Sequence, residues 1–332
     1  MILARQLEFP AAQPDGFPVL ADEPPFEPAH HLALEAPREI RSLRDLGYGA
    51  DICHASPTQL AVTSAFRLLS EEGVACLQQV AEELKPSIRS LERISRMVRG
   101  GAYQSRFLRD LCLSPDVADF ISGLCEAPMA PHTIPHQLGH LNYNPEQTGE
   151  NVDKWHVDTL RVDYVLFVTD PAGVQGGEFQ YFDGTKEEVA ALKVEGQALP
   201  ANRVISPDVP GAGWAVLQQG NHVVHRARGL EAPGERVTMV NGYVPLDMAH
   251  PDFTRYDQLF LADPAHVSTT EYRRHVAWMA RERLQHMISN APFADDREAA
   301  ARELEEVAGL LGEAAAGIRA AGSARMEHFG DE

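Results

Sequence analysis

The feature that most constrains the fold is a change in the sequence pattern at about residue 132. From there to about residue 250 the chain consists of short apolar runs separated by turn-forming residues, a pattern typical of β-strands. Seven strands are predicted, at 134–144, 152–158, 161–169, 177–183, 213–219, 221–227 and 235–245. Alternate positions of 161–169 are apolar or aromatic and the others are mixed, which predicts a strand buried on both faces. So many short antiparallel strands in one stretch favour a jelly roll or a closed barrel.

Helical patterns precede this β-region. The run Ser56-Pro57-Thr58-Gln59 has the residues of a capping box, with proline at the first helical position. The apolar stripe that follows it predicts a helix that ends at Gly73. A second stripe over 77–88 and the start signal Ser114-Pro115 predict two further helices.

Helices are predicted again after Pro251. The run Ser268-Thr269-Thr270-Glu271 reads as the start of one helix, and Asp295 with Asp296 as the start of a second. The second helix carries an apolar seam made of Leu304, Val307, Leu311, Ala314 and Ile318. Such a seam can pack against the barrel or the neighbouring helix, or it can form the contact of a homodimer through the C-terminal helices.

These patterns predict one domain of the α+β class with a mainly β core. Residues 1–50 are rich in proline, which predicts an extended N-terminal arm because proline cannot continue a helix. The single domain is expected over 51–332. It would comprise a helical region at 57–130, the β core at 131–250 and the C-terminal helices at 251–332.

Composition narrows the classes of partner. The formal net charge of −19 and the pI near 5.1 argue against nucleic acid, whose phosphates need clustered Lys and Arg, and against an anionic membrane surface. No run approaches the roughly 20 apolar residues of a membrane span, and the N-terminus lacks a signal peptide's pattern. The four cysteines form no CxxC pair, which favours reduced thiols. A cytoplasmic protein that acts on a small molecule is therefore expected.

The segment that carries chemistry is His156-Val157-Asp158. Residues two apart in a strand point to the same face, so the imidazole and the carboxylate can reach one metal ion. Alone, this short pattern is weak evidence for a metal site, because two polar residues on the exposed face of a strand would give the same sequence pattern. A further histidine on a late strand of the same region, at His222 or His225, would complete two histidines and one carboxylate. That ligand set is the facial triad of non-haem iron(II) oxygenases.

A possible anion clamp follows the late histidines. Arg236 comes eleven residues after His225, and Thr238 lies on the same strand face as Arg236. A guanidinium and a hydroxyl in this arrangement can bind one carboxylate together, because arginine presents a planar fork of donors.

In this order of motifs the sequence resembles the 2-oxoglutarate-dependent iron(II) dioxygenases. The elements are H-x-D, a distant histidine, and R-x-S/T about ten residues later. Gly176-Gly177-Glu178-Phe179 resembles the family's GG turn, and the run 213–217 leads into the second histidine as it does there. The helical half before the barrel is most similar to the phytanoyl-CoA dioxygenase-like branch. The resemblance covers about residues 57–250.

The resemblance implies a double-stranded β-helix that uses Fe(II), 2-oxoglutarate and O₂ and releases succinate and CO₂. His156, Asp158 and His225 match the metal ligands, since His222 would lie too far from the arginine for the family's spacing. Arg236 and Thr238 match the residues that hold the distal carboxylate of 2-oxoglutarate. Asn142 is a looser match to a residue at its other end. Because halogenases of this family lack the carboxylate ligand, Asp158 favours hydroxylation or desaturation.

Two residues are candidates for substrate binding. Arg161 follows the metal-binding segment and could bind an anionic group, or it could form a salt bridge with Asp163 or Asp153. His140 is predicted on one strand face together with His136 and Asn142, where it could line the pocket mouth or be a structural histidine.

Two other functions compete with the oxygenase. A cupin-like metal dioxygenase or isomerase would use the metal without 2-oxoglutarate, and it would not need Arg236 and Thr238. A non-catalytic ligand-binding barrel would need neither the clamp nor a complete triad. The identity of the substrate is not encoded in any motif.

Overall fold

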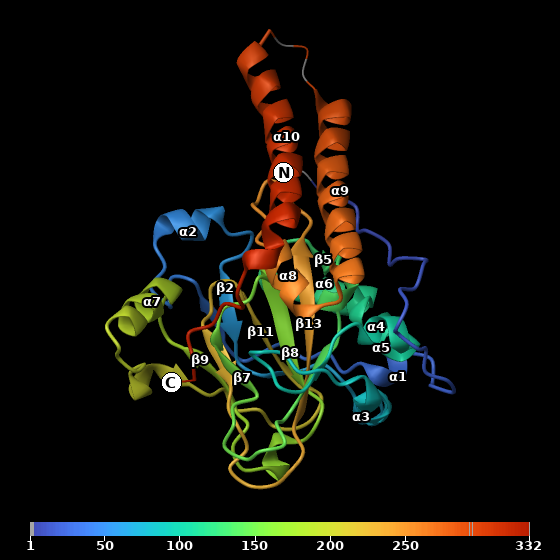
Figure 1. The fold of residues 1–332 in the computed structure, drawn as a ribbon, viewed down its shortest axis with the longest axis vertical. Coiled ribbons are helices and arrows are strands. Elements are labelled where there is room, and N and C mark those ends of the chain that lie inside the picture. The colour runs from blue at the N-terminus through green and yellow to red at the C-terminus, as the bar shows by residue number, and fades with distance from the viewer. Residues whose placement is uncertain (1–2, 292, 294, 332) are drawn as a thin grey trace.

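The computed structural model describes residues 3–291, 293 and 295–331, so residues 1–2 of the expected arm and residue 332 lie outside the described part. Two antiparallel sheets form the centre, and helices surround them (Figure 1). Side chains from both sheets line one cavity between them. This arrangement confirms the expected α+β class with a double-stranded β-helix core and C-terminal helices.

The larger sheet has nine strands, all joined by antiparallel pairing. Its path is β1 (Ile40–Ser42), β2 (Leu60–Thr63), β11 (Trp214–Gln218), β8 (Val162–Phe167), β13 (Val237–Pro245), β6 (His140–Tyr143) and β4 (Met97–Val98). In addition, β3 (Phe66–Arg67) pairs with β11 and β5 (Met129–Pro131) with β13. The smaller sheet has the order β10 (Val204–Ile205), β9 (Phe179–Phe182), β12 (His225–Ala227) and β7 (Asp153–His156).

The pleat of the large sheet separates a packed core from the cavity. All six residues of β8 are buried, as predicted for a strand covered on both faces. Tyr164 and Leu166 face the hydrophobic core, whereas Asp163 and Val165 face the cavity. The same alternation holds in β13, where Met239 faces the core and its neighbours on either side face the cavity. Each strand therefore contributes both to the core and to the site.

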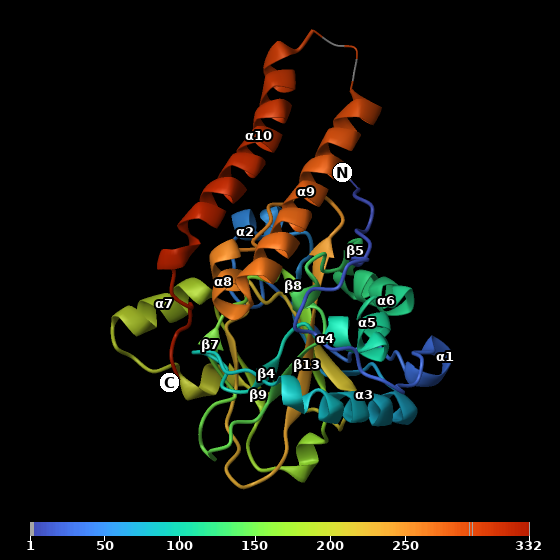
Figure 2. The same cartoon turned by 45° about the vertical axis from the view of Figure 1, so that its right-hand side comes forward.

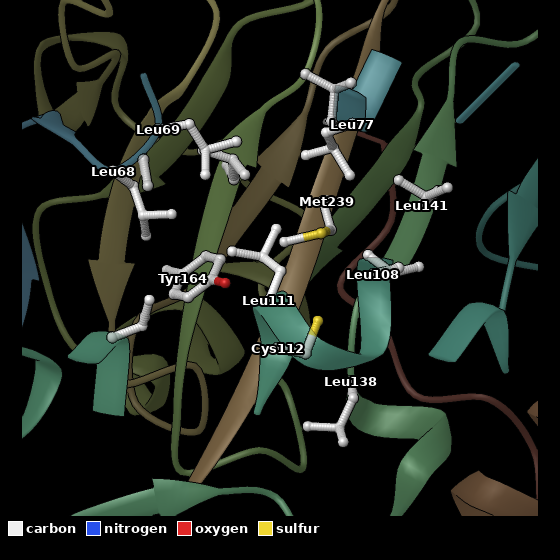
Figure 3. Close-up of a cluster of buried hydrophobic side chains, with 14 of the residues drawn as sticks. Leu68, Leu69, Leu77, Leu108, Leu111, Cys112, Leu138, Leu141, Tyr164 and Met239 are labelled. Atoms are coloured by element: carbon white, nitrogen blue, oxygen red, sulfur yellow. The ribbon is translucent and has the colours of Figure 1, made fainter. Parts of the chain in front are cut away.

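Helices of the N-terminal half cover the core face of the large sheet (Figure 2). They are α1 (Pro28–His31), α3 (Glu71–Glu83), α4 (Gly101–Gln104), α5 (Arg106–Cys112) and α6 (Pro115–Cys125). Figure 3 shows leucine side chains of α3 and α5 packed against Leu141, Tyr164 and Met239 of the sheet. Burying one leucine side chain contributes roughly 1.5–3 kcal/mol, so this layer fixes the sheet that carries half of the site.

The predicted helix after Ser56 is wrong. Residues 60–63 are a fully buried strand that pairs with β1 and β11, and 66–67 form another strand. The apolar stripe matched a helix by spacing, but two partner strands satisfy the backbone here and bury both faces. A helix begins only at Glu71, where the side chain of Ser70 accepts from the amide of Gly73. The helix predicted over 77–88 overlaps α3, which ends at Glu83, and the helix predicted from Pro115 is α6.

All seven predicted strands are shorter in the structure, and two of them are less than half as long as expected. The segment 134–144 starts with a 3₁₀ turn, Pro135–Gln137, and becomes a strand only at His140, after Gly139 with φ +57°. His136 therefore does not lie on the strand face of His140 and Asn142, as had been predicted. The segment 221–227 starts with a turn in which the amide of His222 donates to the carbonyl of Gln219. Only 225–227 is strand.

Short helices cover the small sheet and the connections. They are α2 (Ala50–Ala55) and α7 (Lys186–Val194), both on one side of the barrel in Figure 1. Single 3₁₀ turns occur at η1 (Lys85–Ser87), η2 (Pro135–Gln137), η3 (Pro171–Gly173), η4 (Ala201–Arg203) and η5 (Ala321–Ser323).

The C-terminal helices form a hairpin that projects from the barrel (Figures 1 and 2). After α8 (Tyr256–Ala262) come α9 (Ala265–Asn290) and α10 (Arg297–Ala320). Helix α9 begins before the predicted cap, because the chain turns into it directly after Pro264. Asp296 does cap α10, accepting from the amide of Ala299 at 2.9 Å. None of the helices in the described chain combines the length and the apolar character that crossing a membrane requires.

The apolar seam of α10 is only partly covered. Val307 and Ala314 are buried, whereas Leu304 and Leu311 are 60% and 46% exposed. The covered residues show that the seam packs within the molecule, with Ala314 in a cluster beside α9. The homodimer contact expected through these helices stays a prediction.

Residues 324–331, the C-terminal tail, return from the hairpin to the barrel. The amide of Trp155 donates to the carbonyl of Gly330 at 2.9 Å, and the amide of Phe329 donates back to Trp155 at 2.6 Å. Phe329 also packs on the buried cluster around Trp155 and Phe182. The tail thus lies along the free edge of β7, one of the strands that carry the site.

Candidate metal centre

Three predicted ligands converge on one point of the cavity. The ligand atoms of His156, Asp158 and His225 all lie within 4.8 Å of one another. The Nε2 atoms of His156 and His225 lie 3.4 Å and 3.3 Å from the two carboxylate oxygens of Asp158. His156 and His225 are buried, and the side chain of Asp158 is 17% exposed. Two imidazoles and a carboxylate at this spacing fit an Fe(II) ion with open coordination positions.

Backbone carbonyls orient both imidazoles. Nδ1 of His156 donates to the carbonyl of Lys154 at 2.6 Å, and Nδ1 of His225 donates to the carbonyl of Val223 at 3.0 Å. Each imidazole is thereby held in the tautomer that has its proton on Nδ1. The Nε2 atom next to the carboxylate then keeps a lone pair with which it can bind a metal ion. Second-sphere bonds of this kind fix ring orientation in metal sites.

Asp158 lies just outside the strand on which it was predicted. Strand β7 ends at His156, and Asp158 is held by its own amide, which donates to the carbonyl of Gly220 at 2.8 Å. The approach is so close that a Cβ on Gly220 would lie 2.8 Å from Oδ2 of Asp158. Glycine is needed here for lack of space.

The electrostatics of the centre favour a bound cation. Burial alone would raise the pKa of Asp158, but His225 and His156 hold that pKa well below its usual range. Burial is also the main cause that lowers the pKa of His156. Burial opposes a charge on His225, but Asp158 raises the pKa of that imidazole, so the ionised carboxylate attracts the positive charge that a metal ion would supply.

A second buried carboxyl lies behind the triad. Asp163 accepts from Nε2 of Gln218 at 3.0 Å, and the same Nε2 is 3.1 Å from Nε2 of His225. Burial, with the charge of Asp158 nearby, raises the pKa of Asp163 to about 8. Asp163 and Gln218 were not predicted as site residues, because only their alternation along β8 and β11 would have placed them here.

The predicted anion clamp lies in the same cavity as the triad. Arg236 is 3% exposed; its Nε donates to the carbonyl of Gly177 at 2.7 Å and its Nη1 to Oγ1 of Thr238 at 3.2 Å. Its Nη2 is buried without a hydrogen-bond partner among the described residues. Burial lowers the pKa of Arg236 to about 10. A buried cation with a free donor is costly unless an anion binds to it.

The GG turn contacts the arginine of this clamp. Gly176 and Gly177 have φ values of +80° and +76°, in the left-handed region that favours glycine. A Cβ on Gly177 would lie 3.1 Å from Cδ of Arg236. The turn therefore brings its carbonyl against the guanidinium and leaves room for the arginine side chain.

Asn142 and His140 both line the cavity from β6. Oδ1 of Asn142 and Nδ1 of His140 are buried without hydrogen-bond partners among the described residues. Burial lowers the pKa of His140 to about 3, so its ring is neutral.

Arg161 is placed elsewhere. It donates to the carbonyl of Pro251, and its guanidinium lies 4.5 Å from the ring centre of Phe253. Neither of the expected salt bridges forms: Asp163 bonds to Gln218, and Asp153 pairs with Arg93 at 2.9 Å. His136 is also absent from the cavity, since its Nδ1 bonds to Glu271 at 2.8 Å.

His222 does not point at the triad. Its ring contacts Tyr48 and Phe253, and the hydroxyl of Tyr48 donates to its backbone carbonyl at 2.6 Å. Burial lowers the pKa of His222 to about 4. Of the two late histidines, His225 therefore lies with His156 and Asp158.

Arg93 is a residue of the cavity that sequence reasoning missed. It lies in the irregular segment before β4, pairs with Asp153 and brings Nη2 to 3.9 Å from Asp158. No motif surrounds it, so only the fold reveals its position.

No family model matches the sequence, and no curated protein is significantly similar to it. Among solved structures, the non-haem alpha-ketoglutarate-dependent epimerase SnoN from nogalamycin biosynthesis is 15% identical, with a TM-score of 0.44 over 60% of this chain and 84% of that one. EctD from S. alaskensis with 2-oxoglutarate and 5-hydroxyectoine is 18% identical, with a TM-score of 0.42 over 71% and 88%. HygX from Streptomyces hygroscopicus with nickel and 2-oxoglutarate is 13% identical, with a TM-score of 0.39 over 62% and 87%.

Proposed function

We propose that this protein is an Fe(II)- and 2-oxoglutarate-dependent dioxygenase that hydroxylates or desaturates a small-molecule substrate. Because the TM-scores of these solved structures are below 0.5, the proposal depends on the site itself. The observation that carries it is buried Arg236, whose Nη2 has no partner among the described residues, in the same cavity as the His156, Asp158 and His225 cluster.

The two halves of the cavity suit the two ends of 2-oxoglutarate. The triad leaves coordination positions for a 2-oxo acid and O₂, and Arg236 with Thr238 can bind the distal carboxylate. Thr238 accepts from Arg236 and so keeps its own hydroxyl proton for that carboxylate.

The charges of such a complex balance. A divalent iron and the Arg236 cation offset the carboxylate of Asp158 and the two carboxylates of 2-oxoglutarate. Arg93 and Asp153 form a neutral pair beside them. A buried site with balanced charge avoids the large cost of an unpaired ion.

The residues have separate tasks in the reaction. Iron supplies the oxidising chemistry when bound, with 2-oxoglutarate as the source of two electrons for O₂ and with succinate and CO₂ as products. The carbonyls of Lys154 and Val223 keep both histidines in the ligating tautomer. Asp158 occupies the position that halogenases leave for chloride, so transfer of hydroxyl, or desaturation, is favoured.

The alternatives fit the site less well. A cupin-like metal enzyme without a cosubstrate would have no anion for Arg236, and a non-catalytic barrel would need neither the triad nor the clamp. The deciding experiment mixes the protein with Fe(II) and 2-oxoglutarate without O₂. A weak visible charge-transfer band that requires both components is expected. If the band is absent although Fe(II) binds, the cupin-like function is favoured instead.

A further inference from the structure

A second cavity adjoins the metal centre. It shares Arg93, His140 and Asp158 with the first, so the two cavities meet at these side chains beside the carboxylate ligand. We call this second cavity the outer chamber. A substrate that is to be oxidised at the metal must present its reacting carbon at this junction.

Apolar and polar side chains contribute about equally to the wall of the outer chamber. Its side chains come from β4 and the segment before it, from η2 and β6, from the loop after β7, from α8 and from the C-terminal tail. The apolar contributors include Ile94, Met97, Val157, Leu160, Leu259 and Met326. These apolar side chains favour a ligand whose body is apolar where it contacts them, through roughly 25 cal/mol for each Å² of apolar surface removed from water.

Each charged group of the described lining already has a partner. Arg99 forms a bidentate pair with Asp263, with both distances 2.7 Å. Arg93 pairs with Asp153, and Glu327 accepts from Arg255 at 2.6 Å. The remaining charged group, Asp158, belongs to the triad. A charged substrate group would therefore be buried without a counterion, which is strongly unfavourable.

His140 contributes a polar ring to the wall. Nδ1 of His140 is buried and unbonded among the described residues, and the ring lies at the junction of the two cavities. A neutral imidazole can accept one hydrogen bond and donate another. It can therefore fix one oxygen or nitrogen of a ligand next to the metal.

From these contacts we propose that the outer chamber is the substrate site and that its substrate is uncharged. The substrate has an apolar body and a hydrogen-bonding group held by His140, near the carbon to be oxidised. The C-terminal tail completes the site through Met326. This inference rests on the proposed function for the location of the reaction, but its experiment reads binding near the metal without turnover.

The experiment uses Mn(II) in place of iron, because a paramagnetic ion broadens the proton NMR lines of ligands bound close to it. Three skeletons, cyclohexane, benzene and adamantane, each carry in turn a carboxamide, a carboxylate and an aminomethyl group. They are added to the Mn(II) protein with 2-oxoglutarate, and Zn(II) protein is the diamagnetic control. We expect a carboxamide to be broadened by Mn(II) and to bind about tenfold or more tighter than its carboxylate and ammonium analogues.

Several outcomes would overturn the inference. One is tighter binding of the charged analogues; another is a lack of Mn(II)-dependent broadening for all three carboxamides. Failure of 2-oxoglutarate to bind would instead count against the proposed function, and the amide series can then be scored with Mn(II) alone.

Two variants locate the bound amide. Met326→Trp should fill the chamber from the tail and remove the broadening, whereas Leu284→Trp, on an exposed position of α9, should preserve it. His140→Phe keeps an aromatic ring of similar shape and should weaken amide binding by about tenfold, the value of one lost hydrogen bond. If Met326→Trp and His140→Phe both bind as wild type does, the chamber is not the site.

Discussion

His225 lies directly opposite His156 in the pairing of β12 with β7, and the centres of their rings are 4.1 Å apart. Strand pairing thus sets the separation of two metal ligands that are 69 residues apart in the sequence. The ring of His222 is excluded from this position, because the turn that precedes β12 directs it toward Tyr48.

The first prediction separates these two late histidines. His225→Ala should weaken Fe(II) binding by more than about 100-fold, since loss of an outer-shell partner alone costs up to that much. His222→Ala should bind Fe(II) as wild type does. Competition with a chelator under anaerobic conditions measures both. The reverse result, with His222→Ala unable to bind iron, would show that the ligand is misassigned.

The second prediction concerns Arg236. Removing one partner of a buried ion pair typically costs ~3–5 kcal/mol, so Arg236→Ala should weaken the binding of 2-oxoglutarate by about two to four orders of magnitude. Fe(II) affinity should change little, because Arg236 contacts no metal ligand. Arg236→Lys should restore part of the affinity, since it keeps the charge but loses the second donor. Titration of 2-oxoglutarate into the anaerobic Fe(II) protein is the measurement; equal affinities for wild type and Arg236→Ala would refute the clamp.

The third prediction concerns the close approach of Gly220 to the site. In Gly220→Ala the new methyl group would press on the carboxylates of Asp158 and Asp163. We expect the Fe(II) affinity to fall by about tenfold or more, comparable to the loss of an outer-shell contact. Gly123→Ala is the matched control: it lies in α6 with open space around it and should leave metal binding unchanged and gain roughly 0.5–1 kcal/mol of stability. An unaltered metal affinity in Gly220→Ala would contradict the packing argument.

The fourth prediction concerns stability in mild acid. Burial, with a contribution from His275, lowers the pKa of His132 to about 3, and its Nδ1 accepts from the amide of Ile134 at 3.2 Å. The unfolded chain takes up this proton near pH 6.5, whereas the folded chain does not until about pH 3. Stability should therefore fall as the pH falls between these values, by about 2.5 kcal/mol from this residue between pH 7 and pH 4.5.

Urea unfolding of the metal-free protein at pH 7 and pH 4.5 measures this loss. In His132→Gln the residue no longer titrates, so the difference between the two pH values should shrink by about that amount. An unchanged difference would mean that His132 is already protonated in the folded protein.

The sequence predicted the β core well, because alternation along a strand is a local property. The mixed positions of β8, for example, proved to face the cavity, with Asp163 and Val165 among them. The triad could be predicted for the same reason: a two-residue spacing and a fixed distance to Arg236 are visible in the chain. Even so, Asp158 reaches the centre from a loop tied to Gly220 and not from the strand.

What the sequence did not reveal depends on contacts between distant segments. The stretch 60–63 has the spacing of a helix, and only its pairing with β1 and β11 makes it a strand. Arg93 carries no motif, and its place beside Asp158 follows from how the segment before β4 crosses the barrel. Arg161 had a plausible partner in sequence, but the loop at Pro251 lies closer to it than any carboxylate that was predicted.

The C-terminal tail reaches the barrel from the end of a long helical hairpin and is attached along the edge of one strand. Its residues take no part in the nine-stranded sheet, yet Met326 and Glu327 form part of the wall of the outer chamber. This eight-residue segment is therefore a suitable target for directed evolution of the chamber. Libraries at 324–328, with Phe329 and Gly330 retained as the anchor, would vary the shape of the chamber while the metal ligands and the strands of the barrel stay as they are.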